Sequence, residues 1–213
     1  MWLYNNPVNI VFGEKKIKQI HKIIDNKKYI LITSNSILRE YLTDIVNSKN
    51  APRLTYSKIK PNPDYVDLIE LMDFFSKINF HDIDFILAIG GGSVMDSAKV
   101  IAAFKNNKNF LTDFIKKNKP PIINNALDLI AVPTTSGSSS ELTCWATIWD
   151  KEMNSKLSLA HKDLYPKTAI VDPSIMLDKP KGLTISTGLD ALSHSMESIW
   201  NINANPISAM HGI

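Results

Sequence analysis

Residues 85–99 read FILAIGGGSVMDSAK, a run that combines the signals of a buried strand, a glycine turn and a helix start. The apolar run Phe85–Ile89 is short and rich in strand formers, as in a parallel strand covered on both faces. The three glycines that follow permit a tight turn and let a ligand approach the backbone amides closely. Apolar residues then recur at helical spacing from Val94, with Ser93 as the expected N-cap. The run therefore predicts a strand–turn–helix unit of an α/β fold.

A helix that begins directly after a glycine turn favours an anion at that turn. Its free N–H groups and the positive end of the helix dipole point toward the turn, so we expect a phosphate there. The alternative is a purely structural turn, because strand-to-helix connections in general favour glycine and serine. The run is neither a G-x-G-x-x-G motif nor a P-loop, so its spacing leaves both interpretations open.

Strand and helix signals alternate along most of the chain, which predicts a parallel sheet with helices packed on it. We expect strands at Val8–Phe12, Lys28–Thr33, Arg53–Tyr56, Leu127–Val132 and Thr168–Asp172, and a hairpin formed by Cys144–Asp150 and Lys156–Ala160. Helices are expected over Glu14–Asp25, after a cap at Ser34-Asn35-Ser36, from Asp64 to Ile78, and in a short piece at Phe110–Ile115 within a surface connection, Asn106–Asn125.

Composition restricts the classes of protein. A chain of 213 residues with 44% hydrophobic content suits one domain, or one domain and part of another. The net charge of +3 is small and the lysines are interleaved with acidic residues, so no nucleic-acid partner is expected. Cys144 is the single cysteine, which rules out an intramolecular disulfide and suits a reducing compartment. The start, Met1–Pro7, lacks the features of a secretory signal and no apolar run approaches about 18 residues. We therefore expect a cytoplasmic protein with no membrane partner.

Two further stretches carry polar groups that can bind a ligand. Residues 133–141, PTTSGSSSE, are either a flexible linker or a ligand-binding loop, and their position after a buried strand favours the loop. Beyond Pro180 the pattern becomes helical, which places a domain boundary there. Asp190 and His194 are four residues apart and share a helix face, where both can reach one divalent cation. The alternative is an ordinary i,i+4 pair on a solvated face.

Taken together, four motifs resemble the iron-containing (group III) alcohol dehydrogenase family, which shares its fold with dehydroquinate synthases and glycerol dehydrogenases. They are Gly90-Gly91-Gly92-Ser93-x-x-Asp96 with Lys99, Pro133-Thr134-Thr135-x-Gly137-x-x-x-Glu141, Tyr165-Pro166-Lys167 to Asp172-Pro173, and Thr187-Gly188-Leu189-Asp190-Ala191-x-x-His194. The resemblance implies a Rossmann-like dinucleotide-binding domain with a parallel sheet over residues 1–180. It also implies that residues 181–213 begin a helical metal-binding and catalytic domain that is incomplete here.

The same resemblance implies an NAD(P)H cofactor and a divalent metal, Fe²⁺ or alternatively Zn²⁺. Asp190 and His194 match the first two of four metal ligands and are the expected catalytic residues; the metal polarises the alcohol or aldehyde oxygen while the nicotinamide exchanges a hydride. The residues expected to bind the dinucleotide are Ser34, Asn62, Gly91, Gly92, Ser93, Asp96, Thr134, Thr135, Ser138 and Lys156.

Two departures from the family pattern matter. Many NAD-preferring members carry an aspartate where this chain has Ser34, and its loss removes a carboxylate that would repel a 2′-phosphate, so NADPH is an expected cofactor beside NADH. The chain also ends before the family's two remaining metal-ligand histidines; His211 is a candidate third ligand by residue type alone. We therefore expect a C-terminally truncated member that is itself inactive.

The substrate class follows from the same resemblance. Residues 198–206 and 161–165 are similar to the branch that reduces phosphonoacetaldehyde to 2-hydroxyethylphosphonate, and a small primary alcohol or aldehyde is the broader expectation. One alternative is a lyase of the dehydroquinate synthase type, against which the Asp190–His194 pairing weighs. Another is a non-catalytic dinucleotide-binding fragment. A homodimer is an open alternative to a monomer.

Overall fold

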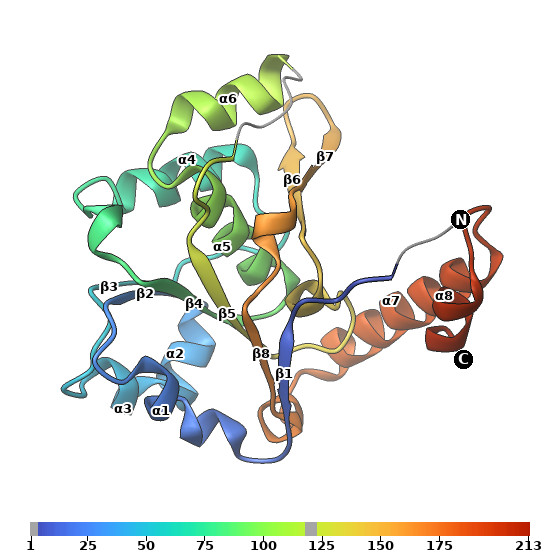
Figure 1. Cartoon of the computed structure of the whole chain (residues 1–213), viewed down its shortest axis with the longest axis horizontal. Helices are drawn as coiled ribbons and strands as arrows, with labels where there is room; N and C mark the ends of the chain where they lie inside the picture. The colour runs from blue at the N-terminus through green and yellow to red at the C-terminus, as the bar shows by residue number, and fades with distance from the viewer. Residues whose placement is uncertain (1–3, 118–122) are drawn as a thin grey trace.

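The computed structural model describes residues 4–117 and 123–213. The expectations for Met1–Leu3, and the part of the expected surface connection at 118–122, lie outside the described residues. The central element is a parallel six-stranded sheet with the order β1-β8-β5-β4-β2-β3 (Figure 1). Its strands are β1 (Asn9–Phe12), β2 (Tyr29–Thr33), β3 (Leu54–Tyr56), β4 (Phe85–Gly90), β5 (Asp128–Pro133) and β8 (Thr168–Val171). The predicted α/β fold with a parallel sheet is confirmed.

Side-chain alternation along the central strands divides the core into two layers, one on each face of the sheet. Even-numbered residues such as Ile86 and Ala88 pack with α4 (Tyr65–Phe74), α5 (Gly92–Phe104) and α6 (Lys108–Lys117). Odd-numbered residues such as Leu87 and Ile89 pack with the segment 17–24 and with α2 (Asn35–Tyr41). Both faces of β4 are therefore covered, as its unbroken apolar run predicts, and the glycine turn begins at its buried carboxyl end.

The remaining elements lie around this body. The predicted hairpin forms from β6 (Trp145–Asp150) and β7 (Ser155–Ala160), which pair antiparallel. Helices α7 (Lys181–Trp200) and α8 (Pro206–His211) project from the α/β body (Figure 1), and neither contains a buried residue. The predicted boundary between residues 1–180 and 181–213 stays a prediction, although α7 does begin at Lys181. Among the described residues, no helix is both long and apolar enough to span a membrane.

Three local predictions are wrong in detail. The helix expected over Glu14–Asp25 is a 3₁₀ turn at Lys16–Gln19 followed by α1 (His21–Ile24), because the buried Asp172 carboxylate accepts the Lys15 and Ile17 N–H groups and fixes a separate turn. The helix after Ser34 breaks at Leu42 into α2 and α3 (Thr43–Val46). The helix from Asp64 ends at Phe74 rather than Ile78.

The predicted N-cap of α5 is also wrong. Gly91 occupies that position in an extended conformation, and Gly92 is the first helical residue. The Ser93 hydroxyl is engaged elsewhere, because its Oγ accepts the Asn62 N–H at 3.0 Å. Ser93 therefore ties the glycine turn to the segment before α4 instead of closing the helix end.

Candidate functional site

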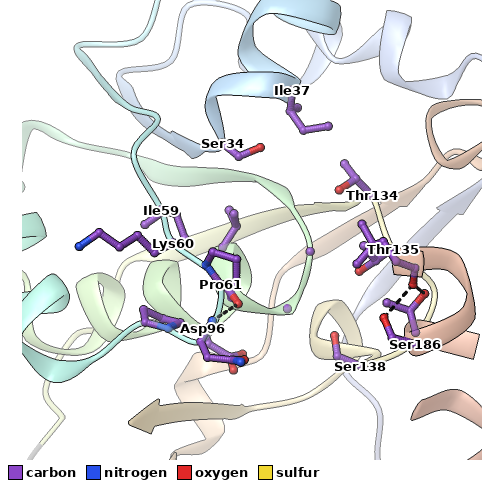
Figure 2. Close-up of a pocket in the computed structure, with 18 of the residues that line it drawn as sticks. Ser34, Ile37, Ile59, Lys60, Pro61, Asp96, Thr134, Thr135, Ser138 and Ser186 are labelled. Atoms are coloured by element: carbon purple, nitrogen blue, oxygen red, sulfur yellow. Dashed lines mark hydrogen bonds between the residues drawn. The ribbon is translucent and has the colours of Figure 1, made fainter. Parts of the chain in front are cut away.

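A cavity of about 840 Å³ opens at the carboxyl ends of the central strands, the usual ligand position in open α/β sheets. Figure 2 shows Thr135, Ser138 and Ser186 on one side and Ile59, Lys60 and Pro61 on the other. Asp190 lines this cavity. So does every residue predicted to bind the dinucleotide: Ser34, Asn62, Gly91, Gly92, Ser93, Asp96, Thr134, Thr135, Ser138 and Lys156. Their convergence comes from at least five separate segments. Their contact with a cofactor stays a prediction.

The glycine turn lies directly against the loop that follows β5. A Cβ atom added to Gly91 would come within 3.0 Å of Thr135 Oγ1, and one added to Gly92 within 2.8 Å of Ser138 Oγ. Gly91 has a φ of −80°, a backbone conformation that any residue can adopt. Glycine is needed at this position because the side chain of Thr135 leaves no space for a Cβ atom. The two segments thus form a cradle that a larger side chain would fill.

The N-terminus of α5 supplies hydrogen-bond donors to that cradle. The Val94 and Met95 N–H groups donate to the Gly91 carbonyl, at 3.0 and 3.2 Å. Helix geometry leaves the Gly92 and Ser93 N–H groups without an acceptor inside the helix. Because these groups lie at the positive end of the helix dipole, the cradle suits a phosphate or pyrophosphate. The residues present therefore fit a dinucleotide.

Asp96 is held by the protein on both carboxylate oxygens. Oδ1 accepts the Ser140 hydroxyl at 2.7 Å and Oδ2 accepts the Thr147 N–H at 3.0 Å. Burial raises the pKa of Asp96, although both hydrogen bonds and the nearby Lys99 favour its ionised form. Asp96 therefore fixes the start of the β6–β7 hairpin at the wall of the cavity.

The two ends of the cavity differ in chemistry. Near α2, the Ser34 and Ser36 hydroxyls lie 3.2 Å apart, and Glu40 also lines this end. On the hairpin, Lys156 Nζ lies 5.6 Å from the centroid of the Trp149 ring. Hydroxyls at one end and a cation over an aromatic ring at the other provide polar contacts for an extended, charged ligand.

Asp190 and His194 lie on one face of α7, as their spacing predicts. His194 Nε2 is 3.6 Å from Asp190 Oδ1, and both side chains are at least half exposed. Asp190 lines the cavity, whereas His194 does not. The described residues contain no group of three or more His, Cys, Asp or Glu side chains arranged to hold a metal ion. A carboxylate oxygen and an imidazole nitrogen fit Fe²⁺ or Zn²⁺ by donor type, but supply only two ligands.

Other residues that line the cavity carried no signal in the sequence. They lie outside the four motifs and become neighbours only when the chain folds: Ile37, Glu40, Ile59, Lys60, Trp149, Lys179, Leu183 and Ser186. Thr187 also lines the cavity and was not predicted as a site residue, although it opens the motif that contains Asp190.

Comparison with known proteins places these features in a family. Residues 7–173 match the family model described as iron-containing alcohol dehydrogenase. The chain is 31% identical over 211 residues to the NAD-dependent methanol dehydrogenase of Bacillus methanolicus, covering 95% of this chain and 54% of that protein. It is 30% identical over 220 residues to alcohol dehydrogenase 4 of Saccharomyces cerevisiae strain ATCC 204508, covering 99% and 56%.

Solved structures give the same result. The sulfoacetaldehyde reductase of Bifidobacterium kashiwanohense, solved in complex with NAD⁺, superposes with a TM-score of 0.87 at 28% identity and covers 100% of this chain and 57% of its own. The NADH-dependent butanol dehydrogenase A of Thermotoga maritima gives a TM-score of 0.84 at 29% identity. The chain therefore spans about half the length of the relatives it matches, and its Rossmann-like fold is theirs.

Proposed function

We propose that this chain, which belongs to the iron-containing alcohol dehydrogenase family, binds NAD(P)H and contributes two ligands to the metal site of an alcohol dehydrogenase or aldehyde reductase. The observation that carries the proposal is the single cavity shared by the glycine cradle and Asp190. A dinucleotide held by its pyrophosphate on the cradle extends in both directions along one continuous site. Ser34 lines that site at one end, and the carboxylate of Asp190, a proposed metal ligand, lines it from α7.

In this proposal the chain's own residues bind and orient the cofactor. The Gly92 and Ser93 N–H groups donate to the pyrophosphate, and the Thr135 and Ser138 hydroxyls face the same cradle from across the turn. Lys156 adds a positive charge from the hairpin.

Asp190 and His194 would hold the divalent metal, Fe²⁺ or Zn²⁺, through a carboxylate oxygen and an imidazole nitrogen. When bound, such an ion supplies Lewis-acid polarisation of an alcohol or aldehyde oxygen. Because both side chains are at least half exposed, a metal ion held by them would be open to further ligands from outside this helix face. A bound nicotinamide would supply or accept the hydride that interconverts a small primary alcohol and its aldehyde.

For the substrate we propose a short aldehyde with an anionic group, of which phosphonoacetaldehyde, reduced to 2-hydroxyethylphosphonate, is the specific candidate. Support comes from residues 161–165 and 198–206, and from the similarity to a sulfoacetaldehyde reductase. Sulfoacetaldehyde and phosphonoacetaldehyde are both short aldehydes that carry an anionic group.

A second candidate is a dinucleotide-binding chain without catalysis of its own. It is favoured because the part of the chain that the structure describes contains no group of three or more His, Cys, Asp or Glu side chains placed to hold a metal ion. A lyase of the dehydroquinate synthase type uses a related fold, but the Asp190–His194 pairing resembles the oxidoreductases.

The experiment follows the absorbance of NADH and NADPH with ferrous or zinc ion and phosphonoacetaldehyde, acetaldehyde or another short aldehyde. We expect this chain alone to bind the dinucleotide with little turnover, because two ligands leave a metal ion mostly hydrated. In a polypeptide that supplies the further ligands, we expect turnover that His194→Ala abolishes while NADH binding is kept. Full turnover in the His194→Ala protein would contradict the proposed function.

A further inference from the structure

Lys99 is a fully buried lysine on α5 to which the proposed function assigns no role. Its exposed fraction is 0%. Nζ donates to the Ser140 carbonyl oxygen at 2.7 Å, to Ser140 Oγ at 2.9 Å and to the Trp145 carbonyl oxygen at 2.6 Å, and Thr143 Oγ1 lies at 3.3 Å. A buried ammonium group is costly unless its donors are satisfied, and here they are satisfied by one short segment, residues 140–145.

Asp96, one turn earlier on α5, binds Ser140 of this segment and also Thr147 on β6. Its carboxylate accepts the Ser140 hydroxyl and the Thr147 N–H, at 2.7 and 3.0 Å. Ser140 Oγ therefore lies between the two charged side chains, accepting from Lys99 and donating to Asp96. Together they attach the segment between β5 and β6 to the helix whose N-terminus forms the cradle.

Ser140 in turn contacts the cradle. Its N–H donates to Ser138 Oγ at 3.4 Å, a long hydrogen bond, and Ser138 Oγ is the atom that a Cβ on Gly92 would approach to 2.8 Å. The contacts form a continuous path from Lys99 through Ser140 and Ser138 to the glycine turn. Lys99 does not line the cavity, so it acts on a ligand only through this path.

We propose that Lys99 is a positioning residue for dinucleotide binding, which holds Ser138 opposite the Gly91–Ser93 turn by fixing Ser140. The inference rests on the proposed function, since it assigns the cradle to a pyrophosphate. It predicts that removal of the ammonium group loosens the wall of the cradle and weakens dinucleotide binding, although Lys99 itself does not contact the ligand.

Protonation of Lys99 provides a separate readout. Burial lowers the pKa of Lys99 to about 8, while the charges facing it, Asp96 on its own helix and Cys144 and Glu141 on the opposite segment, act in the other direction. Above that pH the neutral amine loses a donor, so dinucleotide affinity falls between pH 7 and 9. Folding stability moves the opposite way: the unfolded chain keeps the proton up to the ordinary value of 10.5, so this group adds stability as the pH rises above 8.

The test is a fluorescence titration with NADH at several pH values, with circular dichroism to verify folding. We expect Lys99→Met to weaken binding at pH 7 by about tenfold or more, because loss of one charged donor leaves several buried acceptors without a partner. We also expect the fall in affinity between pH 7 and 9 to disappear in that variant. Lys108→Met is the matched control, because Lys108 is half exposed and pairs with Asp73 on the surface.

Ser140→Ala serves where Lys99→Met does not fold, because it removes only the hydroxyl that joins Lys99 to Asp96. We expect weaker NADH binding in it by about threefold or more. Unchanged affinity in folded Lys99→Met or in Ser140→Ala, with normal binding by the unsubstituted chain, would overturn the inference alone. Absence of NADH and NADPH binding by the unsubstituted chain would overturn the proposed function and the inference together.

Discussion

Gly137 lies directly against Asp190, so the loop after β5 and helix α7 meet without an intervening side chain. A Cβ on Gly137 would come within 3.0 Å of Asp190 Oδ2 and 2.7 Å of the Thr187 carbonyl oxygen. Gly137 belongs to the loop that supplies Thr135 and Ser138 to the cradle. Gly137 therefore sets how closely the Asp190 carboxylate approaches the proposed cofactor site.

The contact predicts the effect of Gly137→Ala. The added methyl group meets backbone on α7, so the helix must move away, at a cost of about 1–3 kcal/mol. We expect faster hydrogen exchange of the α7 amides, measured by mass spectrometry. Gly182→Ala is the control on the same helix, since a Cβ there meets nothing within 4 Å. Equal exchange in the two variants would show that the close contact does not hold α7.

Ser34 predicts cofactor preference. It lines the cavity near α2 without a carboxylate of its own, so Ser34→Asp should introduce repulsion against a 2′-phosphate. We expect the Kd for NADPH to rise relative to that for NADH by about tenfold or more in paired titrations. Ser48→Asp makes the same chemical change at an exposed position outside the cavity and should leave the ratio unchanged. If the ratio of the two Kd values is unchanged in Ser34→Asp, the 2′-hydroxyl of the bound cofactor does not lie near Ser34.

Asp172 predicts the acid sensitivity of the fold. Burial alone would raise its pKa, but hydrogen bonds from Ser174 and from the Ile17 and Lys15 N–H groups outweigh burial and hold the pKa below the usual 3.8. The stability that this carboxylate contributes is present above pH 3.8 and is lost as the pH falls through the lower folded pKa.

Asp172→Asn should therefore lower the free energy of unfolding at pH 7 by about 2 kcal/mol and flatten its decline in acid, as measured by urea titration at pH 7 and pH 3. Asp44→Asn, at an exposed position on α3, should change neither value much. A similar acid decline in the two variants would assign it to other carboxylates.

Metal retention is a further prediction. With two ligands from α7 and no larger ligand group among the described residues, the chain should keep far less than one equivalent of iron or zinc after dialysis. Elemental analysis of the dialysed chain measures this directly. A full equivalent that survives dialysis and is lost in His194→Ala would show that the pair recruits further ligands within this chain.

Local sequence signals predicted the fold well wherever one pattern dominates. The apolar run Phe85–Ile89 predicted a buried parallel strand covered on both faces, and the structure has β4 there. The helix after Ser34 was predicted less well, because the break at Leu42 has no proline or glycine to mark it. Ser93 was misassigned as the N-cap because its partner, the Asn62 N–H, lies 31 residues away in the sequence.

The same limit applies to the site. Motif residues such as Gly92 and Thr135 were predictable because each follows a recognisable strand. Lys60 and Trp149 line the cavity through long-range packing that no local pattern encodes. The network of Lys99, Asp96 and Ser140 was likewise hidden, because it joins a helix to a segment more than 40 residues later.

The central claim, that the glycine cradle binds a dinucleotide, is tested most directly by fluorescence titration of the chain with NADH and NADPH beside Gly92→Val. Gly182→Val is the control, in open space on α7. We predict saturable binding to the unsubstituted chain and to the control, and a loss of at least about tenfold in folded Gly92→Val, because its side chain fills the space before Ser138. Equal affinity in Gly92→Val, or no binding of either dinucleotide to the unsubstituted chain, would contradict the claim.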